Sequence, residues 1–208
     1  MSFELWIAFA VASVILLSIP GPTVMLVVSY ALGRGRSTGW FTVPGVALGD
    51  FTAMTLSLLG AGAVLAASAT LFTVLKLAGA AYLVWLGIQL WRAEPTAGIL
   101  EGEAKSKSGR TMFWQSYIVT ALNPKGIVFF IAFVPQFVVA SEPALPQFVI
   151  LEATFLALAA ANAALWAVLA GEMRNRFKSP RVLKAINRVG GSLLIGAGAV
   201  TALARRTA

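Results

Sequence analysis

The sequence predicts an all-α membrane protein built from six transmembrane helices. Of the 208 residues, 59% are hydrophobic and 12% are charged, whereas soluble domains average roughly 45–50% and 25%. The apolar residues gather into six stretches, each close to the roughly 20 residues that a membrane-spanning helix requires. The connections between these stretches are short, so the chain has room for one membrane domain and no separate soluble domain.

The expected spans are separated by turn-forming or polar segments. In order, they cover approximately residues 3–32, 39–65, 69–91, 112–139, 145–171 and 189–203. The separating segments are Gly33-Arg34-Gly35-Arg36, small residues at 66–69, a polar stretch at 92–110, Ser141-Glu142-Pro143 and a basic stretch at 174–188. No Lys or Arg precedes the first apolar stretch, which also continues past any cleavage point, so we expect an uncleaved helix there.

The polar stretch divides the chain into two halves of three helices each. The expected parts are a first repeat over residues 1–92, a cytoplasmic loop over 93–111 and a second repeat over 112–208. Residues 96–107 mix Glu and Lys with Gly and Ser, which is typical of a mobile loop. An odd number of helices per half makes the second half enter the membrane from the opposite side, so the sequence predicts an inverted repeat.

The distribution of basic residues predicts the orientation. If six helices alternate, twelve Lys and Arg residues share one side: Arg34, Arg36, Arg92, Lys105, Lys107, Arg110, Arg174, Arg176, Lys178, Arg181, Lys184 and Arg188. The other side has only Arg205 and Arg206 outside the helices. The positive-inside rule therefore places both termini outside the cytoplasm. The same topology explains the net charge of +8, so the basic residues do not indicate nucleic-acid binding.

The chain contains no Cys and no His. Disulfides, Cys/His zinc sites, haem ligation and Cys/His catalytic pairs are therefore excluded. No cofactor or metal is expected, and most classes of enzyme are ruled out.

Two spans are interrupted near their middle. In the first, Pro20-Gly21-Pro22 removes two backbone donors and clashes with the preceding turn, so we predict a broken helix. In the fourth, Asn123-Pro124-Lys125 stands at the matching position. Matching interruptions in two halves indicate a transporter's binding site, because half-helix ends offer unpaired N–H and C=O groups. These six residues are the first candidates for substrate binding, and an amino acid, which carries a carboxylate and an ammonium, suits such ends.

Lys125, Asp50 and Glu152 are charged residues expected inside the bilayer. Lys125 is too far from Arg110, about 20 Å along a helix, to reach the cytoplasmic surface easily, so it requires a partner. Asp50 and Glu152 are the candidate partners, and either could carry a coupling proton, because a carboxylate at mid-bilayer costs about 3 kcal/mol or more. Asp50 is also a candidate substrate ligand. The preceding Gly45 and Gly49 allow close approach of another helix, for which the broken first helix is the candidate.

Two amides are weaker candidates. Gln136, beside Pro135, could also bind substrate, although an amide in lipid more often bonds to a neighbouring helix. Asn162 in the fifth span is interpreted in the same way.

Taken together, these motifs resemble the lysine exporter family, in its homoserine/threonine exporter branch. The similarity covers nearly the whole chain and rests on residues whose order and spacing agree with the family pattern: Pro20, Gly21, Pro22, Gly49, Asp50, Asn123, Pro124, Lys125, Pro135 and Gln136. The resemblance implies an exporter of amino acids or close derivatives in the bacterial inner membrane, driven by the proton motive force and forming a homo-oligomer. Both termini would then be periplasmic.

The mechanism expected from these residues is alternating access with proton antiport. Backbone N–H groups after the breaks, with Lys125, would hold the substrate's carboxylate, while Asp50 and free carbonyls would hold its ammonium. A channel for small polar solutes is the nearest alternative. An enzyme acting on lipid through Asp50 and Lys125 is disfavoured because no nucleophile stands with a base. A structural scaffold does not account for the cost of charges inside the membrane.

Overall fold

The computed structural model describes residues 1–67, 69–92, 107–139 and 141–172, with isolated positions between 184 and 202. Regular structure in these ranges is entirely helical. The elements are α1 (Phe3–Ser18), α2 (Pro22–Arg34), η1 (Arg36–Thr38), α3 (Gly39–Ala67), α4 (Ala69–Arg92), α6 (Gly109–Ala121), α7 (Pro124–Ala132), η2 (Val134–Phe137) and α8 (Ala144–Glu172). The all-α prediction is therefore confirmed over the part of the chain that the structure describes.

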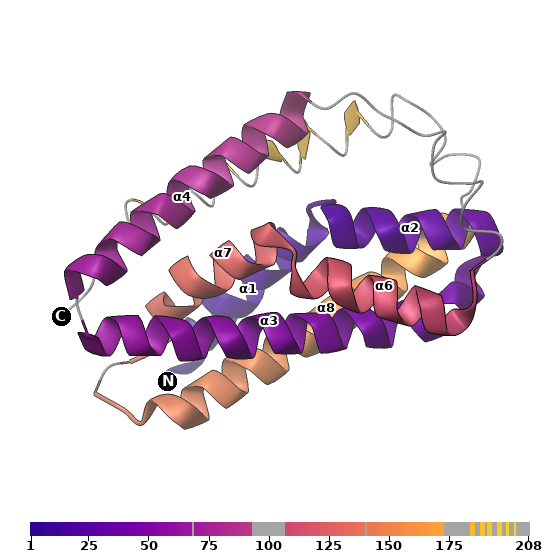
Figure 1. The fold of residues 1–208 in the computed structure, drawn as a ribbon. Coiled ribbons are helices and arrows are strands. Elements are labelled where there is room, and N and C mark those ends of the chain that lie inside the picture. The colour runs from indigo at the N-terminus through magenta and orange to yellow at the C-terminus, as the bar shows by residue number, and fades with distance from the viewer. Residues whose placement is uncertain are drawn as a thin grey trace.

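Two long helices form the frame of the bundle. Helices α3 and α8 each have 29 residues and pack against each other. The pair α1–α2 packs along α8, and the pair α6–α7 packs along α3. Helix α4 lies to one side (Figure 1). The two pairs run in opposite directions, so α1 and α7 occupy one end of the bundle with Met1, and α2 and α6 occupy the other end with Arg36 (Figure 1). We call these the Met1 end and the Arg36 end.

Up to four membrane spans lie within the described residues. Arg36–Gly60 and Ala144–Glu172 are each long and apolar enough to cross a membrane, and each of the two bent pairs also qualifies when counted as one span. Helix α4 covers the third predicted span. The sixth, residues 189–203, is described only at isolated positions, where Gly191 packs closely on Gly87 of α4. Most of the predicted 93–111 loop also lies outside the described residues, but α6 begins at Gly109, three residues before the predicted start of the second repeat.

Both predicted helix breaks are confirmed. The axis turns by 55° between α1 and α2 and by 44° between α6 and the segment Pro124–Phe137. Ile19 and Asn123 each precede a proline and have extended backbone conformations, ψ 118° and 110°, because the proline ring excludes the helical conformation of the residue before it.

A new helix begins directly after each break. Pro22 and Pro124 occupy the first turns of α2 and α7, where the missing N–H has no intrahelical partner to lose. Asn123 caps α7 by accepting a hydrogen bond from the Lys125 backbone N–H at 3.2 Å, whereas Gly21 gives α2 no side-chain cap.

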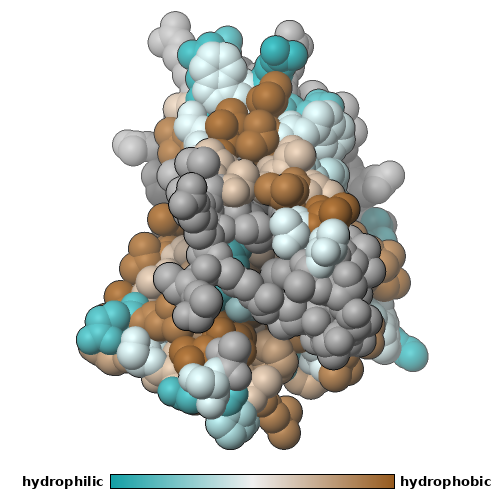
Figure 2. All heavy atoms as spheres, turned by 90° about the vertical axis from the view of Figure 1, so that its left-hand side faces the viewer, coloured by the Kyte–Doolittle hydropathy of each residue, from teal (hydrophilic) through white to brown (hydrophobic). Residues whose placement is uncertain are grey.

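Large hydrophobic side chains cover much of the described surface. Trp40 is 83% exposed, and Leu56 and Leu59 are 65% and 67% exposed. Figure 2 shows such residues spread over the surface seen from the Met1 end. A water-soluble protein rarely exposes so much apolar area, so this surface suits lipid.

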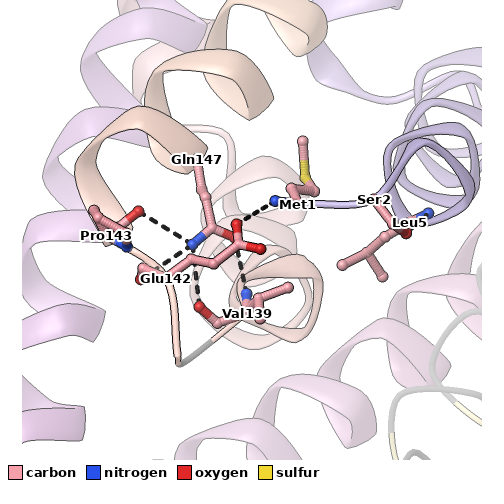
Figure 3. Close-up of polar contacts among 7 residues, drawn as sticks. All are labelled: Met1, Ser2, Leu5, Val139, Glu142, Pro143 and Gln147. Atoms are coloured by element: carbon pink, nitrogen blue, oxygen red, sulfur yellow. Dashed lines mark hydrogen bonds and ion pairs between the residues drawn. The ribbon is translucent and has the colours of Figure 1, made fainter.

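The loop before α8 is held by one amide. Gln147, only 3% exposed, accepts a hydrogen bond from the Val139 N–H at 2.9 Å and donates to the carbonyl oxygens of Val139, Glu142 and Pro143 (Figure 3). Glu142 also forms an ion pair with the amino group of Met1 (Figure 3). These contacts tie α1, η2 and α8 together at the Met1 end.

Candidate functional site

The two helix breaks contact each other inside the bundle. The hydroxyl oxygens of Thr23, in the first turn of α2, and Thr120, in the last turn of α6, are 3.2 Å apart. The Asn123 amide donates to the Thr23 hydroxyl at 3.2 Å. A Cβ placed on Gly21 would lie 3.3 Å from Cε of Lys125, so the second break places its lysine directly on the glycine of the first.

Lys125 is buried, and its ammonium bonds to the end of α1. Nζ donates to the carbonyl oxygens of Leu16 at 3.1 Å and Ile19 at 2.8 Å. The break at Pro20 leaves the last carbonyls of α1 without the partners of a continuous helix, and these carbonyls form the negative end of the helix dipole. The ammonium of α7 therefore caps the C-terminus of α1.

Asp50 lies in the middle of α3 with 7% of its surface exposed. Its charge interacts with that of Lys125, although the two form no direct ion pair among the described residues. No hydrogen bond to the Asp50 carboxylate is found in the described part of the chain. The carboxylate instead lines a cavity, so it is available to a ligand.

The cavity has a volume of about 40 Å³. Its polar lining consists of Thr23, Asp50, Asn123, Lys125 and Asn162, and its apolar lining includes Val24, Val27, Val46 and Ala163. Because a water molecule needs about 10–15 Å³ on this measure, the cavity has room for a few waters but not for an amino acid with a side chain. The helices around it must move apart to admit such a substrate.

The glycine strip of α3 packs against α6. A Cβ on Gly45 would lie 2.4 Å from the Phe113 carbonyl oxygen, and one on Gly49 would lie 2.7 Å from Tyr117 O. Our expectation that the broken first helix approaches this strip was therefore wrong. The close approach places Asp50, next to Gly49, beside the second break.

Gln136 and Glu152 lie away from the cavity. The Gln136 amide donates to the Ala132 carbonyl oxygen within its own segment at 2.8 Å. The Glu152 carboxylate accepts a hydrogen bond from the Thr55 hydroxyl at 2.6 Å, which joins α8 to α3. Neither residue lines the cavity, so the structure groups Asp50, Asn123 and Lys125 with the first break and separates the other two candidates from them.

The structure adds two groups that the sequence analysis did not single out as ligands. The hydroxyls of Thr23 and Thr120 link the two breaks, and their positions next to the proline motifs are the only sequence signal for this role. Asn162 does bond to a neighbouring helix, as interpreted, because its amide donates to the Leu17 carbonyl at 3.0 Å. It also lines the cavity.

The site therefore offers groups for both charges of a zwitterion. The first turn of α2 has N–H groups without intrahelical partners and no side-chain cap, and it lies beside the Lys125 ammonium. These groups favour an anion. The Asp50 carboxylate and the C-terminal carbonyls of α1 favour a cation.

The chain is similar in sequence to several known membrane proteins. The homoserine/homoserine lactone efflux protein of Salmonella typhimurium is 34% identical over 207 residues, which cover 99% of each chain. An uncharacterized membrane protein of Vibrio cholerae is 32% identical and covers 99% of this chain and 100% of its own. The leucine efflux protein of Klebsiella pneumoniae is 27% identical and covers 91% of this chain and 88% of its own.

No solved structure matches the chain. The family of LysE type translocators matches residues 14–205. A chain with two helix breaks around buried charges, matched to this family over nearly its full length, is a transporter and not an enzyme. The protein belongs to the LysE type translocator family, in an amino-acid exporter branch.

Proposed function

We propose that this protein exports amino acids or close derivatives across the bacterial inner membrane by alternating access, in exchange for protons. The observation that carries the proposal is the buried Asp50 and Lys125 at the contact between two helix breaks. Charges inside a membrane are expensive and typically mark a substrate or ion pathway. Relatives named as efflux proteins for homoserine, homoserine lactone and leucine support the choice of substrate class.

The substrate's carboxylate binds at the first turn of α2 and at Lys125, and its ammonium binds at Asp50. Pro20, Gly21 and Pro22 expose the ends of α1 and α2, and Asn123 and Pro124 do the same for α6 and α7. The two charges of the site and the two charges of the substrate then cancel, so a loaded site carries no net charge through the membrane.

Asp50 is the preferred carrier of the coupling proton. It lines the cavity, and in the described residues its carboxylate accepts no hydrogen bond. Protonation and substrate binding therefore compete at one group, which is the simplest way to couple two opposite flows. Glu152, bonded to Thr55, is the alternative carrier.

Six spans in two inverted repeats would place the Arg36 end in the cytoplasm and the Met1 end in the periplasm. Arg34, Arg36, Lys107 and Arg110 lie at or near the Arg36 end, in agreement with the positive-inside rule. Lipid surrounds the bundle. The family resemblance also implies a homo-oligomer, which cross-linking in native membranes tests.

A two-step measurement tests the function. Cells expressing the protein are loaded with dipeptides that contain homoserine, threonine, leucine or lysine, and the amino acid released faster than in vector-control cells identifies the substrate. Proteoliposomes are then loaded with that amino acid under an imposed pH gradient. Uphill movement that stops when the gradient is dissipated supports proton exchange. Only downhill movement would favour a channel, and no release of any amino acid would contradict the proposal.

A further inference from the structure

The position of the Lys125 ammonium raises a question about the site. The C-terminal carbonyls of α1 are where a substrate's ammonium is expected, yet Lys125 Nζ bonds to two of them, at 3.1 Å on Leu16 and 2.8 Å on Ile19. Lys125 therefore occupies, from within the protein, the kind of position that a ligand ammonium would take.

These two carbonyls have the features of a selective ammonium site, which we call the carbonyl seat. They belong to a helix end that Pro20 prevents from continuing. The Lys125 ammonium that they bind interacts with the Asp50 charge, and Leu16 lines the same cavity as Asp50. The surroundings of the seat are buried, because Ile19 is 1% and Leu16 3% exposed. A primary ammonium has three N–H donors, enough for two carbonyls and one further acceptor.

We propose that the carbonyl seat is an ammonium-binding site which Lys125 fills in the substrate-free protein and which the substrate's α-ammonium takes over during transport. This proposal rests on the proposed function. The displaced Lys125 ammonium then pairs with the substrate's carboxylate. One ammonium replaces another on the same two oxygens, and no carbonyl or charge is left without a partner.

The exchange also explains the small cavity. Lys125 is at the N-terminus of α7 and the seat is at the C-terminus of α1, so the two hydrogen bonds fasten the half-helices of the Met1 end to each other. When a substrate's ammonium replaces Lys125 on the two carbonyls, the half-helices α1 and α7 are no longer held together by these bonds. In an empty site the two hydrogen bonds stay in place, which limits proton leakage through an unloaded transporter.

Chemical rescue tests the seat. Lys125→Ala removes the side-chain atoms beyond Cβ, and n-propylammonium replaces those atoms. We expect n-propylammonium to raise the melting temperature of purified Lys125→Ala saturably and to leave the wild type unchanged. Tetramethylammonium, which has the same charge but no N–H donor, is expected to have no effect. If Lys125→Ala accumulates poorly in membranes, n-propylammonium added during expression is expected to restore its level.

Lys107→Ala is the matched control. Lys107 lies at the Arg36 end and donates to Gln115, so its truncation opens no carbonyl seat and should produce no response to n-propylammonium. The proposed seat would be contradicted if the two cations had equal effects on Lys125→Ala. It would also be contradicted if n-propylammonium changed neither the stability nor the accumulation of this variant.

A competition measurement tests the takeover by substrate. The exported amino acid is expected to displace n-propylammonium from Lys125→Ala, and its α-hydroxy-acid analogue, which lacks the ammonium, is not. Displacement by both compounds or by neither would refute the exchange. The rescue needs no transport substrate, so failure of the seat and failure of the exporter function give different results.

Discussion

Asp50 and Lys125 are the charged side chains that the structure buries among the residues it describes. Each would cost about 3 kcal/mol or more alone at mid-bilayer, but Lys125 has two carbonyl partners and the nearby Asp50 charge. Asp50 is less well satisfied, since within the described ranges the charge of Lys125 is its one compensating interaction. A group held in this way is ready to bind a ligand ammonium or a proton.

Asp50→Asn is therefore expected to abolish export and leave the protein inserted, since Lys125 keeps its two carbonyl partners. The neutral amide can neither hold an ammonium as an ion pair nor release a proton. We expect at least a roughly tenfold loss of export, equivalent to about 1.4 kcal/mol. Efflux from proteoliposomes, with membrane levels checked by immunoblotting, measures the change.

Glu152→Gln is the matched control because Glu152 lies outside the cavity. This variant should keep export driven by a pH gradient. If Asp50→Asn stayed active and Glu152→Gln lost its dependence on the pH gradient, Glu152 would be identified as the proton carrier.

At the scale of elements, the two helix breaks place four half-helix ends together. The extended residues before Pro20 and Pro124 are a local effect of proline, and the carbonyl and N–H groups they release line the site. Replacing Pro20, Gly21 and Pro22 together by Ala is expected to favour a continuous helix over residues 3–34. The carbonyls that bind Lys125 would then be used within the helix, so export should be lost.

Pro44→Ala is the control for this variant, because α3 continues through Pro44 without a break. Circular dichroism compares the helix content of both variants, and the efflux assay compares their activity. Undiminished export by the triple variant would show that the break has no part in transport.

The contact between α3 and α6 is the second feature at this scale. A methyl group on Gly49 would lie 2.7 Å from Thr120 Cβ and from Tyr117 O, and a backbone oxygen cannot turn away as a side chain can. We expect Gly49→Ala to lower the free energy of unfolding by about 1–3 kcal/mol and to reduce export by moving Asp50 away from the second break.

Gly60→Ala tests whether this effect is specific, because, among the residues that the structure describes, no atom outside α3 approaches within 4 Å of its Cβ position. Thermal unfolding in detergent should leave Gly60→Ala unchanged or slightly more stable. Equal loss of stability in both variants would mean that α3 tolerates no added methyl group and that the contact with α6 is not the cause.

At the scale of the whole molecule, contacts on either side of the cavity hold the helices together. An aromatic cluster of Phe9, Phe129, Phe130, Phe133, Phe137 and Phe155 fills the Met1 end. Toward the Arg36 end, the buried Tyr30 donates to Gln115, and Arg36 forms an ion pair with Glu172 at 2.8 Å. The proposed alternating access requires one of these two sets of contacts to open before a substrate can enter.

Single cysteines can detect this opening, since the chain has no Cys of its own. Ala163 and Ala170 are both buried in α8, but only Ala163 lines the cavity. We expect a polar thiol reagent to label Ala163→Cys slowly and at a rate that the exported amino acid changes. Ala170→Cys should label more slowly and show no response to the amino acid. Identical labelling of the two variants would exclude an opening centred on the cavity.

Several features could be predicted from the sequence because they depend on local chemistry. The second and fifth predicted spans, 39–65 and 145–171, agree within two residues with Gly39–Ala67 and Ala144–Glu172, since helix length follows from apolar stretches and turn residues. Both breaks were also predicted, because proline acts on its own neighbours. The cost of a charge in lipid identified Asp50 and Lys125.

Only the tertiary structure decided which surfaces meet. The Gly45 and Gly49 strip is compatible with any close helix, and its partner is α6, not the first helix. Thr23 and Asn162 line the cavity while Gln136 does not, and Lys125 binds the carbonyls of α1. The hydrogen bonds that join the Asn123 amide to α2, Lys125 to α1 and Asn162 to α1 connect residues 100 or more positions apart. Such pairings arise from how whole helices pack against one another, and a single sequence carries no local signal for them.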